Sequence, residues 1–389
     1  MAMDRAADTT MFDRDRLARV GERIKEDIAA GRCHGAALMV VHRGNVVIDL
    51  IEGFADRAKG RRLSRQDTFA TMSVGKQFTG VMALSLVERG QLRLHSPVAE
   101  WLPEFAALGK ERVNLFHLLT QTSGVQSSIP DQPPEVLANV ERLAAYASAR
   151  PLESLPGERV NYSILVAHAI IAAMCVRADG RRRSFAKMLE EEIFQPLGMR
   201  DTSLGPRSDL LERLCPVKAA YDKPGLFDPA AVGALEDLIR MPGSELAAGG
   251  FLTTISDLNR FAEMLRNGGE LDGARILSPA MIEYASRNHT GELRNVLFDY
   301  TASYRGWEFC PAYIGLGFFV RGERLIPGPF GVLNSPRTFG GIGAGSTAFW
   351  VDPERELSFV LLTTGLMEDS FHLERVGTLS DMVIASIVH

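Results

Sequence analysis

The pattern of apolar and polar positions predicts strands near both ends of the chain and helices between them. Residues 13–31 carry apolar side chains at helical spacing, and Gly31 is a typical helix end. Residues 35–53 predict two strands around a turn at 43–45. Strand patterns return at 312–321, 338–351 and 357–364, before a predicted final helix over 370–387.

Helical patterns dominate the middle of the chain, for example over 75–89, 135–148, 163–176, 184–194 and 256–267. There is no internal repeat and no low-complexity linker, which suits an insertion better than two successive domains. The simplest fold is α+β: an antiparallel sheet built from both chain termini and flanked by helices, with an inserted mostly helical domain. We expect residues 1–71 together with 295–389 to form the sheet domain and 72–294 the inserted domain. The cleft between them is the expected ligand site.

Composition narrows the range of partners. Of the 389 residues 46% are apolar and 23% charged, and the net charge of −5 provides no broad basic surface, so no nucleic-acid partner is expected. The N-terminus lacks an apolar signal segment, and no apolar stretch is long enough to span a membrane. We therefore expect a cytoplasmic protein with no membrane association.

Neither a metal nor a cofactor is expected. The histidines form no cluster at metal-ligand spacing, and the four cysteines are scattered without a CxxC pair. Glycine motifs typical of nucleotide binding are absent from the sequence.

The stretch TMSVGKQF at 71–78 contains a candidate nucleophile. Ser73 and Lys76 lie three residues apart, so on a helix they share one face. The helix that follows is apolar around most of its circumference, which predicts burial, and burial and the helix dipole both disfavour a charged lysine in its first turn. A neutral amine could take the proton of Ser73. The alternative is that Ser73 caps the helix while Lys76 extends to solvent.

The spacing alone does not decide between these interpretations. About one Ser-x-x-Lys is expected by chance in a chain of this length. A second copy, Ser184 to Lys187, lies in a helical pattern where Ser184 suits an N-cap, and we assign it no catalytic role.

Six segments, in order along the chain and beginning with the one that contains Ser73, resemble the serine β-lactamase and penicillin-binding-protein superfamily, in particular its branch of class C-like esterases (family VIII carboxylesterases) and transesterases. The resemblance runs from about residue 14 to the C-terminus. It is carried by SVGK (73–76), LFHLLTQTSGV (115–125), PGERVNYS (156–163), EEIFQPLGMRDTSLG (191–205), ELAAGGFLTTISDLNRFAEMLRNGG (245–269) and FGGIGAGSTAFWVDPE (339–354). The family fold is an antiparallel sheet from both termini with an inserted helical domain.

The resemblance implies that Ser73 is the nucleophile, that Lys76 activates it and that Tyr162 is the catalytic base partner, expected as a phenolate held by Lys76. A tyrosine ionises near pH 10, so an adjacent ammonium would be needed to lower its pKa. The asparagine of the family's tyrosine motif is replaced here by Ile164, which removes an amide that holds substrate and lysine.

The family's third motif, Lys-Thr-Gly or His-Thr-Gly on a strand beside the cleft, reads Gly341, Ile342, Gly343. We expect these residues and Ile164 to contact substrate. The resemblance also implies that the backbone amides of Ser73 and Ala344 form an oxyanion hole. The lost cation argues against an efficient β-lactamase, because it normally helps to hold the β-lactam carboxylate. A bulged strand of small residues is the alternative interpretation of this segment.

The segment 295–315 is rich in aromatic residues, including Tyr304 and Trp307. We interpret it as a pocket wall or lid, with plain core packing as the alternative.

These features predict a serine carboxylesterase that cleaves small-molecule esters, lactones or thioesters through an acyl-Ser73 intermediate. An acyltransferase would use the same intermediate with an alcohol or amine acceptor. A β-lactamase-like amide hydrolase and a non-catalytic binding protein remain as further alternatives.

Overall fold

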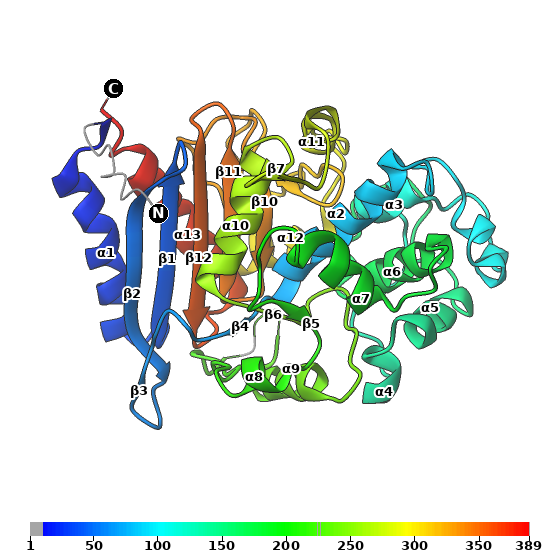
Figure 1. The fold of residues 1–389 in the computed structure, drawn as a ribbon, viewed down its shortest axis with the longest axis horizontal. Helices are drawn as coiled ribbons and strands as arrows, with labels where there is room; N and C mark the ends of the chain where they lie inside the picture. Colours follow the sequence, from blue (N-terminus) through cyan, green and yellow to red (C-terminus); the bar gives the residue numbers. More distant parts are fainter. Residues whose placement is uncertain (1–10, 224, 226, 389) are drawn as a thin grey trace.

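The computed structural model of the protein describes residues 11–223, 225 and 227–388. Residues 1–10 of the charged N-terminal segment lie outside this range. Within it, a seven-stranded antiparallel sheet has the order β3-β2-β1-β12-β11-β10-β9 (Figure 1). The two ends of the chain meet in the middle of the sheet, where β1 (Gly35–His42) pairs with β12 (Leu357–Thr364). The predicted α+β class is therefore confirmed.

The remaining strands of this sheet are β2 (Asn45–Asp56), β3 (Arg61–Arg62), β9 (Phe319–Val320), β10 (Phe339–Gly343) and β11 (Thr347–Asp352). Two predicted strands differ from these bounds. The pattern over 338–351 forms two strands, because Gly345 makes a turn with φ of 58°. The pattern over 312–321 yields only β9, because Tyr313 and Gly317 interrupt the extended backbone with φ of 46° and 84°.

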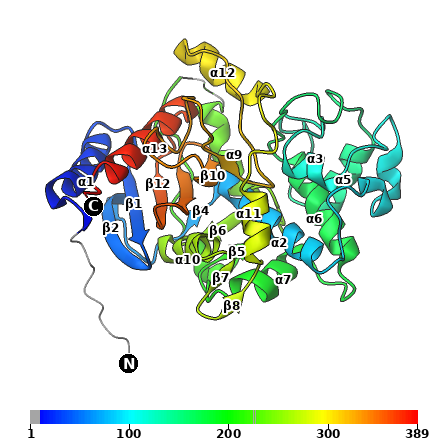
Figure 2. The same cartoon turned by 90° about the horizontal axis from the view of Figure 1, so that it is seen from above.

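Helices cover both faces of the sheet. On one face, α1 (Arg14–Ala29) and α13 (Asp369–Ile384) pack over Leu38 and Val40. On the other, α10 (Ile255–Arg266) packs against β1, β11 and β12 (Figure 2). Because side chains alternate along a strand and both faces are covered, β1 is apolar at nearly every position.

A group of helices lies on the right in Figure 1, where α6 packs against α2, α3 and α5. The group consists of α2 (Gly75–Glu88), α3 (Leu115–Leu119), α4 (Pro134–Leu137), α5 (Val140–Ser148), α6 (Val166–Ala178) and α7 (Phe185–Leu189). The other helices between the ends of the chain are α8 (Ser208–Leu211), α9 (Val232–Arg240), α11 (Pro279–Ala285) and α12 (Val296–Arg305), the last of which packs against α13. Short strands β4 (Phe69–Ala70), β5 (Ser203–Leu204) and β6 (Phe251–Thr253) form a small sheet, and β7 (Glu270–Leu271) pairs with β8 (Ala274–Arg275).

Two of the predicted helices differ in detail. The pattern over 135–148 is split between α4 and α5, because the side chain of Asn139 accepts a hydrogen bond from the Arg142 amide and starts a new helix. The pattern over 184–194 continues from α7 into a π-helical turn, Glu190–Phe194. Helix α10 lies inside the predicted insertion yet packs on the large sheet. The proposed domain boundaries remain a prediction.

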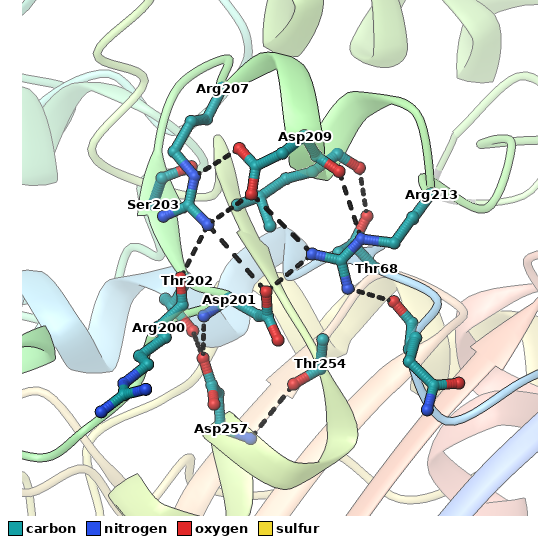
Figure 3. A network of polar contacts seen from close by, with 12 residues as sticks. Thr68, Arg200, Asp201, Thr202, Ser203, Arg207, Asp209, Arg213, Thr254 and Asp257 are labelled. Carbon is teal, nitrogen blue, oxygen red and sulfur yellow. Dashed lines mark hydrogen bonds and ion pairs between the residues drawn. The ribbon is translucent and has the colours of Figure 1, made fainter.

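A polar network holds the segment before the candidate nucleophile (Figure 3). Asp257 on α10 accepts hydrogen bonds from the Asp201 amide at 2.7 Å and the Thr202 hydroxyl at 2.9 Å. Arg213 joins Asp201 Oδ1 to the Gln66 carbonyl, each at 2.6 Å. Residue 66 lies three residues before β4, and β4 leads to Ser73. The network therefore holds the beginning of the chain segment that positions Ser73. Burial raises the pKa of Asp257 to about 6.

Among the described residues, none of the helices combines the length and apolarity needed to cross a bilayer.

Candidate active site

Ser73 lies between the small sheet and α2. It occupies a 3₁₀ turn, Met72–Val74, that leads straight into α2. Met72 has a φ of 48°, an unusual value for a residue with a side chain. A Cβ on Gly75 would lie 2.4 Å from Phe251, so only glycine lets the start of α2 approach β6 this closely. These constraints aim Ser73 into a pocket instead of into the core.

Lys76 is buried beside Ser73, with only 3% of its surface exposed. Its Nζ lies 3.0 Å from Ser73 Oγ, 2.8 Å from the Ile164 carbonyl oxygen and 3.4 Å from the Ala248 carbonyl oxygen. Burial lowers the pKa of Lys76 to about 7. A neutral amine can donate its two protons to the carbonyls and turn its lone pair toward the Ser73 hydroxyl. The alternative of a solvent-exposed Lys76 does not fit this structure.

Tyr162 completes the group around Ser73. Its side chain lies close enough to that of Ser73 to interact with it, and Lys76 Nζ lies 5.0 Å from the centre of its ring. Burial raises the pKa of Tyr162, and the charge of Asp369 raises it further. A raised pKa favours the neutral phenol over the expected phenolate, and none of the hydrogen bonds of Lys76 Nζ reaches the phenol oxygen.

The pocket in front of Ser73 has ≈ 600 Å³ of empty space, including its open mouth. Ser73, Ile164, Ile342, Gly343 and Ala344 all line it, so the structure brings these predicted site residues together. The two backbone amides of the expected oxyanion hole thus belong to residues on the same pocket wall.

Stacked aromatic rings form another wall. Phe319 stacks on Tyr162 at 6.1 Å and on Phe298 at 6.2 Å between ring centres. Phe298 belongs to the aromatic segment 295–315 and lines the pocket, as does Phe227. The predicted Trp307 lines a separate depression, and Tyr304 is 47% exposed, so the structure does not bring these two residues to Ser73.

Gly341 does not face the pocket directly. A Cβ at this position would lie 2.0 Å from Oε1 of Gln77, which is buried on α2. Gln77 Nε2 donates to the Gly317 carbonyl at 2.9 Å, which holds the amide in place. The space beside Gly341 is therefore filled by Gln77, a residue that the sequence analysis missed.

A second, almost wholly apolar pocket meets the first at the nucleophile. It shares Ser73, Ile164, Phe227 and Ala344 with the first pocket and also reaches Lys76. The remaining walls come from Met72, Ile129, Leu165, Leu235, Ile239, Leu246, Ala248 and Gly249. Ser73 thus faces two separate pockets. Such an arrangement can hold two groups of one ligand on either side of the Ser73 hydroxyl.

Asp369 is the second site residue that the sequence analysis missed. It is the first residue of α13, it is partly exposed, and it lines the same pocket as Ser73. Desolvation raises the pKa of Asp369 to about 7, and the neighbouring charge of Glu368 adds to the effect. In the sequence an aspartate at a helix start reads as an ordinary N-terminal residue.

No group of three or more His, Cys, Asp or Glu side chains in the described ranges is placed to hold a metal ion.

Comparison with known proteins places these features in a family. Residues 20–377 match the Beta-lactamase family. The chain is 25% identical over 375 residues to "Esterase/beta-lactamase LipL" of Mycobacterium tuberculosis, across 89% of this chain and 80% of that protein. It is 33% identical over 215 residues to "Esterase EstB" of Burkholderia gladioli, across 50% of this chain and 54% of that protein.

Solved structures share the fold. A penicillin-binding protein homolog from Caulobacter crescentus superposes with a TM-score of 0.79 at 24% identity, covering 96% of this chain and 98% of that one. A family VIII carboxylesterase superposes with a TM-score of 0.77 at 20% identity, covering 95% of this chain and 97% of the other.

Proposed function

This chain belongs to the Beta-lactamase family, and from that premise we propose that it is a serine esterase that acts through a covalent acyl-Ser73 intermediate. The observation that carries the proposal is the pair of Ser73 Oγ and Lys76 Nζ, 3.0 Å apart at the meeting point of two pockets. The names of the two relatives, which both include the word esterase, support the reaction class.

Acylation starts from neutral Lys76. The amine takes the proton of Ser73 as Oγ bonds to the ester carbonyl carbon, and the carbonyl oxygen becomes an oxyanion. The amides of Ser73 and Ala344 are the groups that would stabilise it. The intermediate then collapses, and the bond to the alcohol oxygen breaks. The proton held by Lys76 passes to this leaving oxygen, and the Tyr162 hydroxyl, which lines the same pocket as Ser73, is the group that would relay it.

Deacylation repeats these steps with water. Water loses a proton to the Lys76 and Tyr162 pair as its oxygen attacks the acyl carbon, and the bond to Ser73 Oγ breaks. Ser73 regains a proton, and the carboxylic acid leaves. The low pKa of Lys76, about 7, suits both directions of transfer, because a group that gives and takes protons works best near the ambient pH.

Esters fit this site better than β-lactams. The strand beside the cleft presents Gly341, Ile342 and Gly343 with no cationic side chain, and Gln77 fills the space that a side chain on Gly341 would need. An anionic substrate would therefore lack a charge-assisted contact, typically worth about 1.5–3 kcal/mol. Nitrocefin should be turned over several orders of magnitude more slowly than neutral short-chain p-nitrophenyl esters. Equal rates for nitrocefin and the esters would contradict the esterase proposal and indicate a β-lactam hydrolase.

Acyl transfer is the second candidate activity. The second pocket is apolar and reaches both Ser73 and Lys76, so an alcohol acceptor could occupy it and exclude water from the acyl-enzyme. Product analysis with and without added alcohol separates the two activities, because an acyltransferase would yield mostly the new ester.

The acyl-enzyme can be tested directly. The protein is mixed with p-nitrophenyl butyrate, quenched in acid during turnover and examined by intact-mass spectrometry and peptide mapping. We expect the mass of one butyryl group on the peptide that contains Ser73, and none in the Ser73→Ala variant. The proposal would be contradicted by an acyl group on another residue. It would also be contradicted if the ester is turned over, no acylated protein is found, and a fluorophosphonate fails to label Ser73.

A further inference from the structure

The pocket in front of Ser73 contains one carboxylate in otherwise uncharged walls. Its lining residues in the described part of the chain are Ser73, Tyr162, Ile164, Phe227, Leu297, Phe298, Thr301, Phe319, Ile342, Gly343, Ala344, Asp369 and Leu373. The proposed reaction assigns a role to the serine and the tyrosine but none to Asp369. A carboxylate beside apolar and aromatic side chains is costly to desolvate unless a partner compensates it.

No cation in the described part of the chain pairs with Asp369. Among the described residues it forms no ion pair, and the influences on its pKa are desolvation, Glu368 and two backbone amides. The nearby Arg305 pairs with Glu374 at 2.5 Å and lies over the rings of Trp307 and Phe371. The described part of the chain thus offers Asp369 backbone amides but no paired cation, so a cationic ligand would gain a charge partner there.

Glu368 adds a second negative charge at the same place. One of its oxygens accepts hydrogen bonds from the amide and the hydroxyl of Ser370, and so caps α13. The other oxygen, Oε1, is buried in a residue that is 5% exposed and has no hydrogen-bond partner among the described residues. Arg305 reaches this turn only through Ser370 Oγ, at 3.5 Å, and pairs with Glu374 instead of either carboxylate. Two adjacent carboxylates without an ion pair of their own make this end of the pocket favourable for a cation.

Aromatic rings lie along the same pocket. Phe298, Phe319 and Tyr162 form a continuous stack, and Phe227 lines the pocket as well. Aromatic faces together with a carboxylate are the surroundings in which proteins bind quaternary ammonium groups.

From these observations we infer that Asp369 is a specificity-determining residue. It selects esters that carry a positive charge a few atoms from the scissile carbonyl, either as a quaternary ammonium group or as a protonated amine. The inference rests on the proposed esterase function. The ammonium lies against the Asp369 carboxylate and the aromatic stack, while Ser73 attacks the carbonyl. A substrate carboxylate at the same position would be repelled, which adds to the discrimination against β-lactams.

The selection depends on pH with a defined sign. The ionisable groups that interact with Asp369 are the Glu368 carboxylate and the phenols of Tyr162, Tyr221 and Tyr300. From α12, Arg305 approaches the neighbouring Ser370 Oγ and pairs with Glu374. The pKa of Asp369 is about 7, so its carboxyl is neutral below and charged above that pH. Preference for a quaternary ammonium ester over a neutral one should therefore rise as pH increases through 7. Both esters require neutral Lys76 to the same degree. The titration of Lys76 therefore cancels in the ratio of the two kcat/KM values.

Two matched ester pairs provide the test. On the acyl side, p-nitrophenyl 4-(trimethylammonio)butanoate is compared with p-nitrophenyl 5,5-dimethylhexanoate, which has the same shape without the charge. On the alcohol side, acetylcholine is compared with 3,3-dimethylbutyl acetate. For at least one pair we expect kcat/KM to favour the cation by roughly tenfold or more, the size of one charge-assisted contact. The pair that responds shows which side of the ester lies against Asp369.

Asp369→Asn should reduce that ratio by about tenfold or more, because it keeps the shape and removes the charge. Glu283→Gln is the control: its side chain is 58% exposed on α11, outside both pockets, and the ratio should stay unchanged. The pH dependence of the wild-type ratio tests the inference without any variant, in case Asp369→Asn folds poorly. No preference in either pair, or a preference that Asp369→Asn leaves intact, would overturn it.

A binding measurement separates this inference from the proposed activity. In the Ser73→Ala background, calorimetry with choline should give a Kd at least about tenfold weaker when Asp369→Asn is added. If the wild-type protein hydrolyses neutral esters but Ser73→Ala binds no choline, the esterase proposal stands and the role of Asp369 is rejected. If choline binds through Asp369 while no ester is hydrolysed, the role of Asp369 in binding cations stands and the esterase proposal is rejected.

Discussion

Ser73 and Ser184 have the same spacing to a lysine in very different surroundings. Ser184 is an exposed N-cap whose hydroxyl accepts a hydrogen bond from the Lys187 amide at 3.2 Å. Ser73→Ala should reduce hydrolysis of p-nitrophenyl butyrate by about a thousandfold or more. Ser184→Ala should leave the rate unchanged and reduce stability by about 1 kcal/mol, measured by thermal unfolding. A folded but inactive Ser184→Ala protein would contradict the assignment.

Lys76 should set the pH dependence of catalysis. Its pKa is lowered to about 7, and the reactive form is the neutral amine, so kcat/KM for a neutral ester should rise with pH and level off above 7. Because Asp369 titrates in the same range, the Asp369→Asn variant is measured alongside and should keep the inflection. Lys76→Arg should be inactive at every accessible pH, since a guanidinium does not deprotonate. A flat profile between about pH 6 and 8 would exclude Lys76 as the base.

At the scale of residues, the sequence predicts chemistry best where helical spacing fixes geometry. Ser73 lies in the 3₁₀ turn that leads into α2, and Lys76 lies in the first turn of that buried helix, so the two side chains meet as the spacing predicted. The physical argument for a neutral lysine needed only the apolar residues around it. The pKa of the Tyr162 phenol could not be predicted from the sequence. It depends on burial beside Phe319 and on the charge of Asp369, which both come from distant parts of the chain. Asp369 itself carried no signal in the sequence.

Strand β10 and helix α2 should behave as one packed unit at Gly341. A Cβ there would lie 2.0 Å from Gln77 Oε1, so Gly341→Ala should destabilise the protein by about 1–3 kcal/mol. Gln77→Ala makes room, so the double variant should be more stable than Gly341→Ala alone. Denaturant unfolding of the two single variants and the double variant measures this coupling. A Gly341→Ala protein as stable as the wild type would show that Gln77 moves aside freely.

At the scale of elements, prediction succeeds for long apolar patterns and fails where one residue changes the backbone. The predicted strands at 35–53 and 357–364 match β1, β2 and β12 closely. The pattern at 312–321 loses most of its strand because Tyr313 and Gly317 adopt positive φ. Periodicity records which side chains are apolar, and it does not record such local turns.

The whole molecule should unfold in one step. A single core cluster includes Met39 and Leu362 from the large sheet together with residues of α2 and α6, so separating the helical part would expose the sheet. Leu362→Ala, at a fully buried position, should lower the free energy of unfolding by about 2–5 kcal/mol. Esterase activity and far-UV circular dichroism should then shift to the same lower denaturant concentration.

Leu155→Ala is the matched control, since Leu155 is 72% exposed and the same substitution should leave the unfolding midpoint nearly unchanged. Activity that disappears well before the circular dichroism signal would show that the two parts of the molecule unfold independently.

The pairing of residues near the two ends has a consequence for engineering. Phe12 and Ile387 form a β-bridge, the Asp13 amide donates to the Ser386 carbonyl at 2.7 Å, and these residues lie beside α1, away from α2 (Figure 1). Between these two contacts the described polypeptide is in effect a nearly closed ring. A short linker in place of the residues outside the bridge would join residue 12 to residue 387, and the chain would be reopened at the exposed turn between β2 and β3, around Gly60, with every strand pairing kept. Such a circular permutant would carry the entire catalytic pocket as one transferable cassette within a loop of another protein.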